Sequence, residues 1–162
     1  METNFENKWN LWYHSEKDNW KISGYRNIYT INNFSSFWKL YNNWDKLGGI
    51  TSKHFFLMKE SINPIWEDDN NIKGGCWSFK VSEYQAKELW EDLSMYLVSE
   101  HLSVNKDDVV GLSICLKKNY NVVIKIWNKT SKNNSLKNLN EKILKKWGMD
   151  VIYIAHMPDT IN

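Results

Sequence analysis

Two apolar stretches joined by a short polar turn constrain the fold of this chain more than any other feature. Residues 109–116 and 122–127 are rich in Val, Ile and Leu, and the five residues between them include Lys117 and Lys118. Strand-like runs separated by so few residues pair as an antiparallel hairpin. The sequence therefore predicts a hairpin with a basic tip.

Further strand-like segments alternate with three helical patterns. In the first, apolar residues recur at helical spacing from Asn33, a predicted N-cap, as far as Gly48 and Gly49. The second begins at a capping-box pattern at Ser82 and extends to about residue 100, and the third extends from Ser135 to Gly148. Strands are predicted over residues 8–14, 25–31, 54–60, 76–81 and 151–155. Strands interrupted by three separate helices predict an α+β fold, with an antiparallel sheet and helices on one face.

The first predicted helix has more apolar surface than one sheet contact requires. Its apolar residues cover about half of the helical wheel, and Phe34 and Trp38 lie on the surplus edge. Two interpretations stay open: this edge faces a partner, or the whole helix is deeply packed.

Length and composition exclude several classes of protein. A chain of 162 residues is expected to form one domain, and no segment resembles a membrane span or a signal peptide, so we expect a cytoplasmic protein without a membrane anchor. Two cysteines and four scattered histidines match no metal-ligand spacing, and no cofactor motif is present. A net charge of +2 is too weak to coat nucleic acid through phosphates alone.

Two tryptophans are predicted to lie in polar loops, which is an unusual place for a large aromatic side chain. Trp66 follows Pro64 and precedes Glu67 and an Asp/Asn run, and Trp20 lies in the charged segment 16–21. An indole face together with a carboxylate suits guanine, which can stack and donate two parallel N–H groups. The alternative is that Trp66 covers an edge of the core while Glu67 is solvated.

Five segments together resemble the eukaryotic translation initiation factor 4E family of messenger-RNA cap-binding proteins. They are residues 8–12, 37–42, 64–68, 74–77 and 124–127, and the similarity extends in the family's order from about Lys8 to Asp159. The resemblance implies a curved antiparallel sheet of about eight strands, shaped like a cupped hand, with three long helices on its convex face. It also implies a flexible tail over residues 1–7 and a single cap-binding domain over residues 8–162.

The resemblance assigns the cap base to four side chains. Trp20 and Trp66 would sandwich 7-methylguanine, Glu67 would accept from its N1–H and N2–H groups, the Trp66 backbone N–H would reach O6, and Trp127 would touch the N7-methyl group. The methylated base is cationic, so each indole face adds a cation–π contribution of about 2 kcal/mol to stacking. Selection for the methyl group should therefore depend mainly on the sandwich, and selection for guanine on Glu67.

The cap phosphates are assigned to Lys117, Lys118 and Lys125. The family has an arginine where this chain has Cys76, and lysine lacks the fork with which arginine binds phosphate in two places. Weaker or rearranged triphosphate binding is expected. The alternative is that Lys117 and Lys118 form an ordinary solvated turn.

A helical peptide from a scaffold factor or a repressor is expected to dock on Phe34, Trp38, Asp92 and Met95. Glu91 replaces an apolar residue of the family there and Ser99 a glycine, and a charge in the groove should penalise an apolar anchor. The segment 155–160 resembles the start of a loop near the cap. The Asn and Lys bias indicates A/T-rich coding, as in a parasite or a large DNA virus.

These residues predict a monomeric, non-enzymatic protein that binds capped messenger RNA for translation initiation. One alternative is a cap binder that sequesters messages without recruiting a scaffold, for which Glu91 is the main support. The other, from a different class, is a metal-dependent nucleotide or cap hydrolase that uses Glu67, Asp68 and Asp69.

Overall fold

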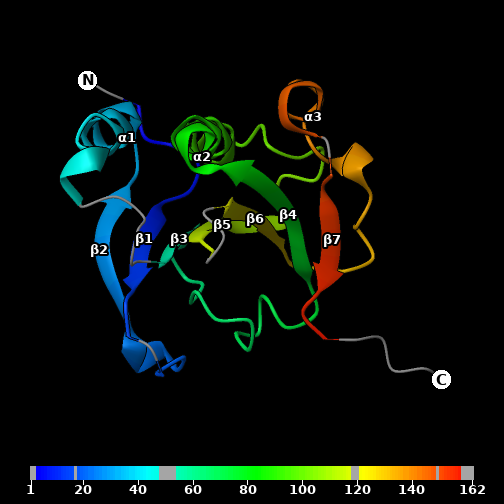
Figure 1. Ribbon diagram of the computed structural model, residues 1–162, viewed down its shortest axis with the longest axis horizontal. Helices are drawn as coiled ribbons and strands as arrows, with labels where there is room; N and C mark the ends of the chain where they lie inside the picture. Colours follow the sequence, from blue (N-terminus) through cyan, green and yellow to red (C-terminus); the bar gives the residue numbers. More distant parts are fainter. Residues whose placement is uncertain (1–2, 17, 48–53, 118–120, 149, 158–162) are drawn as a thin grey trace.

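A single curved antiparallel sheet forms the body of the protein (Figure 1). The computed structural model describes residues 3–16, 18–47, 54–117, 121–148 and 150–157. The strand order is β2-β1-β3-β5-β6-β4-β7. The strands are β1 (Trp9–His14), β2 (Tyr25–Ile31), β3 (His54–Lys59), β4 (Gly75–Ser82), β5 (Val109–Leu116), β6 (Asn121–Asn128) and β7 (Ile152–Ala155).

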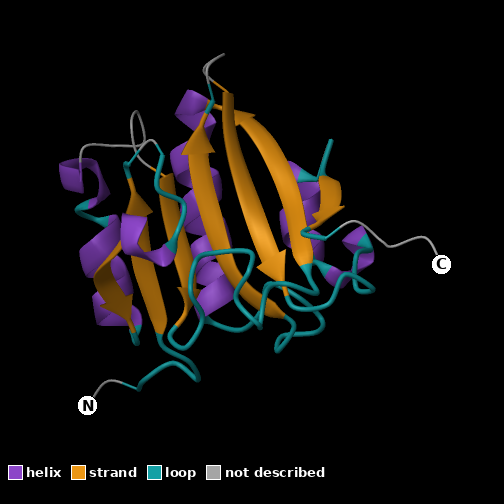
Figure 2. Cartoon of the chain, turned by 90° about the horizontal axis from the view of Figure 1, so that it is seen from below, coloured by secondary structure: helices purple, strands orange, loops and turns teal. Residues whose placement is uncertain are grey.

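The predicted α+β class is confirmed, and three helices cover one face of the sheet (Figures 1 and 2). They are α1 (Phe34–Tyr41), α2 (Glu83–Val98) and α3 (Glu141–Trp147), with 3-10 helices at Ile22–Gly24, Trp44–Leu47 and Leu136–Asn138. The described residues form seven strands rather than about eight, and these seven correspond to the segments predicted one by one. No helix in the described ranges is long and apolar enough to cross a bilayer.

Only α2, with 16 residues, is long, which corrects the expectation of three long helices. The first pattern breaks after Tyr41 because the side chain of Asn43 donates to the carbonyl of Lys39 at 2.7 Å and so competes with the helical hydrogen bonds. The third pattern is a 3-10 turn followed by a new start at Asn140, whose side chain accepts from Lys142 N. The predicted helix end at Gly48 and Gly49 lies outside the described residues.

The predicted helix caps have different outcomes. Asn33 caps α1 as predicted, since its side chain accepts from Ser36 N at 2.8 Å, and Ser36 completes the capping box. The capping box at Ser82 is wrong: the Ser82 hydroxyl donates to the side chain of Gln85, and the Ser82 side chain makes no hydrogen bond that caps α2. Ser135 accepts from Lys137 N and therefore caps the 3-10 turn rather than α3.

Alternation along the strands divides the apolar side chains between two clusters. The main core lies between the sheet and the helices, where Trp77 of β4 and Trp90 of α2 are both fully buried. A smaller cluster lies on the opposite, concave face and contains Phe56, Met58, Ile62, Cys76, Val110 and Trp127. The concave face of the sheet therefore carries its own packed apolar cluster, on the side away from the helices.

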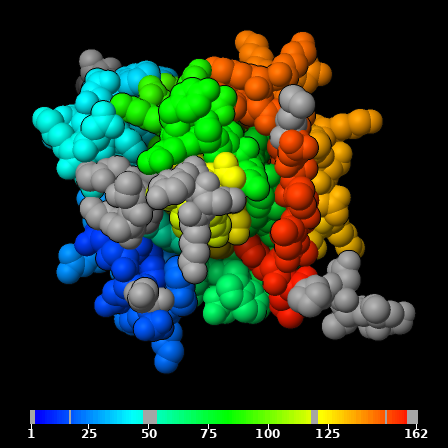
Figure 3. All heavy atoms as spheres, in the orientation of Figure 1, coloured from blue at the N-terminus to red at the C-terminus, as the bar shows by residue number. Residues whose placement is uncertain are grey.

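Side-chain contacts join α3 to α2, and they join the first described residues to α1 and to Lys106. The segments that form α2 and α3 lie side by side (Figure 3), and Lys146 of α3 pairs with Glu88 of α2. Phe5 packs edge-on against Phe34, with ring centroids 4.9 Å apart, and Lys106 pairs with Glu6 at 3.0 Å. The flexibility expected of residues 1–7 stays a prediction.

Candidate functional site

The loop that carries Trp66 is held by two side chains that follow it. The Asp68 carboxylate accepts from the backbone N–H groups of Asn63, at 3.1 Å, and Asn70, at 2.9 Å. The fully buried Asn71 donates to the carbonyls of Asn63, at 3.0 Å, and Ile65, at 2.8 Å. Because these bonds satisfy several backbone groups of the loop, the loop has a defined shape without regular secondary structure.

Both loop tryptophans are exposed, as predicted. The exposed fraction is 44% for Trp66 and 52% for Trp20, and Glu67 is exposed as well. In Figure 1 the loop between β1 and β2 and the loop between β3 and β4 both extend from the sheet on the side away from the helices. Trp66 is not among the residues packed against either apolar cluster, and Glu67 is solvated as the alternative interpretation also expected. The role of Trp66 as a ligand-binding residue stays a prediction.

A cavity of about 340 Å³ brings the predicted base-binding residues together. Trp20, Trp66, Glu67 and Trp127 all line it. The remaining walls come from β2, β3 and the Trp66 loop and consist of Tyr25, His54, Phe56, Pro64 and Ile65. A cavity with several aromatic faces and one carboxylate can take a flat ring that carries positive charge and N–H donors.

Trp127 forms a fixed part of this cavity. It is only 7% exposed, its indole N–H donates to the Ser113 hydroxyl at 3.0 Å, and its ring contacts Phe56 at a centroid distance of 6.1 Å. His156 lies against it with ring centroids 4.8 Å apart. Trp127 therefore presents a small, rigid patch to the cavity, in contrast to the two exposed loop tryptophans.

Two titratable wall residues are uncharged in the folded protein. Burial, followed by the negative charge of Glu67, raises the pKa of Tyr25 to about 12. Burial, followed by the positive charges of Lys117 and Lys125 and by His14, lowers the pKa of His54 to about 3. The charges around the cavity at neutral pH are therefore those of Glu67 and of the lysines.

The structure gives positions for two of the three predicted phosphate-binding lysines. Lys125 pairs in register with Ser78 and Ser113. It lies two residues before Trp127 on β6, so both side chains are on the same, concave face of the sheet. Lys117 is exposed at the end of β5, and its charge acts on His54, as does that of Lys125. Lys118 lies outside the described residues.

Cys76 cannot replace the arginine that the family has at its position. It is buried opposite Trp127 in the β4–β6 pair, and its sulfur lies 3.9 Å from His156 Nε2. Burial raises the pKa of the Cys76 thiol to about 12, although Lys125 opposes this shift. A neutral buried thiol supplies no charge to a phosphate.

The predicted partner surface is exposed only in part. Phe34 and Trp38 of α1 are 47% and 41% exposed, whereas Phe37 is buried, so the surplus edge of this helix does face solvent. Asp92 accepts from the indole N–H of Trp147 at 3.1 Å and from Lys146. Met95 is half-buried against the main core. The Asp92 carboxylate is therefore already hydrogen-bonded to side chains of α3 in the protein without a bound peptide.

Sequence reasoning missed the cavity walls contributed by strands. Tyr25 and His54 flank His14 in register on the two neighbours of β1, and Phe56 follows two residues after His54. The alternation of His54 and Phe56 along β3 was the available signal. It shows that both side chains share a face, but not which face carries the cavity.

The carboxylates proposed for a metal site have other surroundings. Asp68 is bound by the backbone N–H groups described above, and Asp69 is exposed. Within the described ranges, no three His, Cys, Asp or Glu side chains are grouped so that they could hold a metal ion. Asp68 accordingly serves the shape of the Trp66 loop.

Comparison with known proteins identifies relatives across the chain. The model of the family described as eukaryotic initiation factor 4E matches residues 4–157. Eukaryotic translation initiation factor 4E of Candida albicans is 30% identical over 149 residues, which are 85% of this chain and 70% of that protein. Initiation factor NCBP of Oryza sativa is 33% identical over 128 residues, which are 75% of this chain and 55% of that protein.

Most of these curated relatives are longer than the region they share with this chain. Eukaryotic translation initiation factor 4E-3 of Caenorhabditis elegans is 30% identical over 116 residues, which are 65% of this chain but 46% of that protein. The chain thus spans about half the length of several curated relatives.

Solved structures share the fold over nearly the whole chain. The complex of C. elegans eIF4E-3 with the 4E-binding protein Mextli and a cap analog has a TM-score of 0.83 at 23% identity, covering 96% of this chain and 94% of that one. Ascaris suum eIF4E-3 with the m2,2,7G cap has a TM-score of 0.83 at 22% identity, covering 100% of this chain and 96% of that one. Since the family model matches from residue 4 to residue 157, the chain belongs to the eukaryotic initiation factor 4E family.

Proposed function

We propose that this chain binds the 7-methylguanosine 5′ cap of messenger RNA and brings the message to translation initiation. The observation that carries the proposal is the cavity that Trp20, Trp66, Glu67 and Trp127 line together. These residues come from three separate parts of the chain, and a fold that only needed a core would bury its tryptophans. C. elegans and A. suum eIF4E-3 proteins are bound to cap ligands in their structures.

The base would enter the cavity between the two loop indoles. Methylation at N7 makes guanine a cation, which adds about 2 kcal/mol to each desolvated aromatic face. Glu67 would accept from N1–H and N2–H, the Trp66 backbone N–H would reach O6, and the rigid edge of Trp127 would meet the methyl group. Tyr25 and His54 are neutral there, so neither adds a charge that repels the cationic base.

The triphosphate would lie along the concave face towards Lys125 and Lys117. Both lysines act electrostatically on His54, which lines the cavity, and this supports a phosphate path that starts at the base. Lys118 belongs to the same proposal from its sequence position. Because lysine is a point charge without a fork, we expect each phosphate contact to be salt-sensitive.

A helical peptide would dock on the exposed edge of α1 around Phe34 and Trp38, with Met95 and Asp92 on α2. C. elegans eIF4E-3 is seen in complex with the 4E-binding protein Mextli. Glu91 is the observation that favours the alternative, a cap binder without a scaffold, because its charge acts on the nearby Tyr41 and would meet an apolar anchor. The protein would act as a cytoplasmic monomer.

Titration with cap analogues tests the base-binding proposal. Tryptophan fluorescence should be quenched by 7-methyl-GTP at concentrations at least about 100-fold lower than by GTP, since two cation–π contacts are lost with the methyl group. Trp66→Ala should remove most of this preference, whereas Trp147→Phe, on the opposite face, should leave it unchanged. Equal affinity for the two nucleotides would refute the proposal.

A further inference from the structure

A side chain outside the proposed ligand contacts lies directly behind Trp20. The imidazole of His14, the last residue of β1, stacks on the Trp20 indole with ring centroids 3.9 Å apart and an angle of 14° between the planes. His14 is 3% exposed, whereas Trp20 is 52% exposed. One face of the indole is therefore covered by His14, and the opposite face is available to the cavity.

The same imidazole also holds the backbone that leads into Trp20. His14 Nε2 lies 2.5 Å from the carbonyl oxygen of Asn19. A carbonyl can only accept, so Nε2 carries the hydrogen and donates it. The side chain of Asn19 in turn accepts from Lys21 N at 3.1 Å and donates to Ser23 Oγ at 3.1 Å. Hydrogen bonds thus hold the backbone both at Asn19, before Trp20, and at Lys21, after it.

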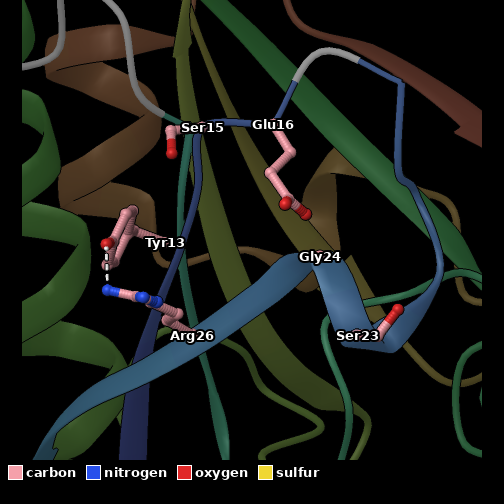
Figure 4. A pocket seen from close by; sticks show the side chains of 6 residues that line it. All are labelled: Tyr13, Ser15, Glu16, Ser23, Gly24 and Arg26. Atoms are coloured by element: carbon pink, nitrogen blue, oxygen red, sulfur yellow. Dashed lines mark hydrogen bonds between the residues drawn. The ribbon is translucent and has the colours of Figure 1, made fainter.

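The Asn19 carbonyl also lies close to Gly24. A Cβ atom added to Gly24 would lie 2.2 Å from this oxygen and 3.0 Å from Glu16 Oε2. Figure 4 shows Glu16 extending towards Gly24 from the segment after β1. Gly24 therefore approaches the same carbonyl that accepts the hydrogen bond from His14.

His14 itself is anchored in the sheet. It pairs in register with Tyr25 of β2 and with His54 of β3, and its ring lies 4.7 Å from that of Tyr25. Trp20, in contrast, lies in an irregular loop that offers no ladder of hydrogen bonds. A side chain on a rigid strand can transmit that rigidity to a loop residue that it contacts through both its ring face and a polar atom.

We propose that His14 is a positioning residue that holds the Trp20 indole in the orientation in which it stacks on the cap base. This inference rests on the proposed function. His14 acts through Trp20 and makes no contact with the ligand. An indole that is already held loses little freedom on binding, so the contribution of His14 is preorganisation of the site.

A double-mutant cycle tests this role with 7-methyl-GTP as the probe. His14→Ala is expected to lower affinity for 7-methyl-GTP about 3- to 10-fold, the range for ordering one side chain on binding. In a Trp20→Ala background the same change should have no further effect, because His14 then has no indole to hold. A general structural role would lower affinity in both backgrounds.

Two more variants separate orientation from folding. His14→Phe keeps an aromatic ring behind the indole and should restore part of the affinity that His14→Ala loses. The methyl group of Gly24→Ala would collide with the Asn19 carbonyl, so this variant should also weaken binding, and only when Trp20 is present. It replaces His14→Ala in the test if that variant does not fold. His101→Ala, at an exposed histidine outside the cavity, is the matched control and should bind like the parent.

The outcomes distinguish this inference from the function on which it rests. A parent protein that does not bind 7-methyl-GTP removes both. A parent that binds, with Trp20→Ala weakened but His14→Ala and Gly24→Ala unchanged, overturns the role of His14 and leaves cap binding intact. An equal loss from His14→Ala with and without Trp20 overturns it as well.

Discussion

Replacing Glu67 by alanine tests the most specific part of the proposed recognition, the selection of guanine. The carboxylate lies at the cavity on a loop whose shape depends on Asp68 and Asn71 rather than on Glu67 itself. Since Glu67 is exposed, its removal should leave the fold unchanged. Any loss of affinity then reports on contact with the ligand.

The size of the effect follows from the number and kind of hydrogen bonds. A carboxylate that accepts from N1–H and N2–H makes charge-assisted bonds, and losing such a group costs about 1.5–3 kcal/mol. At 1.4 kcal/mol for each factor of ten, Glu67→Ala should raise the Kd for 7-methyl-GTP about 10- to 150-fold. Glu67→Gln should lose most of the same amount, because its amide group turns a donor towards one of the two N–H groups.

The assay is tryptophan quenching by 7-methyl-GTP at constant salt, with Asp69→Asn as the matched control. Asp69 is an exposed carboxylate two residues away in the same loop, so its removal changes the net charge equally. A 7-methyladenosine triphosphate probe should bind Glu67→Ala and the parent with similar affinity. The titration of Tyr25 in the free protein gives a second readout, because the charge of Glu67 contributes to its raised pKa.

Two results would refute this reasoning about Glu67. The first is a Kd for Glu67→Ala that equals that of the parent within error. The second is an equal loss from Asp69→Asn, which would mean that only the net charge of the loop matters. If the Tyr25 pKa falls in Glu67→Ala while cap affinity is unchanged, the carboxylate lies where the structure has it but does not read the base.

Further measurements test the loop, the titrating groups and the core. Asn71→Ala should lower the free energy of unfolding by about 1–3 kcal/mol, because two loop carbonyls lose the donor that the buried Asn71 side chain supplies, and a denaturant melt measures this. The folded protein keeps His54 neutral down to about pH 3, whereas the unfolded chain takes up a proton near its ordinary pKa of 6.5. The free energy of unfolding should therefore fall as the pH drops through this window. In melts at several pH values, the free energy of unfolding of His54→Asn should fall less steeply than that of the parent. The Cys76 thiol, with its pKa raised to about 12, should react with iodoacetamide at about pH 8 far more slowly than in urea, as mass spectrometry after timed labelling will show. Trp90→Ala should cost about 3–5 kcal/mol of stability because it empties the centre of the main core, and an unchanged melting transition would contradict this.

The parts of the site that depend on neighbours in sequence were predictable. Trp66 and Glu67 are adjacent, and Pro64 and the acidic run around them indicate a loop, so an exposed indole beside a carboxylate follows directly. The strand β6 likewise followed from its apolar residues, with Trp127 near its end. What these patterns could not supply is a partner for the Trp66 indole from a distant part of the chain.

Local competition between side chains and backbone explains the errors in the helices. Helical periodicity continues past Tyr41 and before Glu141, but Asn43 takes a helical carbonyl and Asn140 starts a new cap. Apolar spacing reports which residues are buried, and it does so equally well for a helix that is interrupted. The lengths of α1 and α3 therefore depended on hydrogen bonds that the periodicity does not reveal.

The sequence by itself determined the fold class, the seven strand segments and the two exposed tryptophans, because strand alternation, helical spacing and turn residues act over a few neighbouring positions. The meeting of Trp20, Trp66, Glu67 and Trp127 at one cavity was decided by the tertiary structure. So was the stacking of His14 behind Trp20, which lies six residues further along the chain. The physical reason is that the curvature of the sheet and the register between strands determine which loops converge, and both arise from the packing of the whole chain.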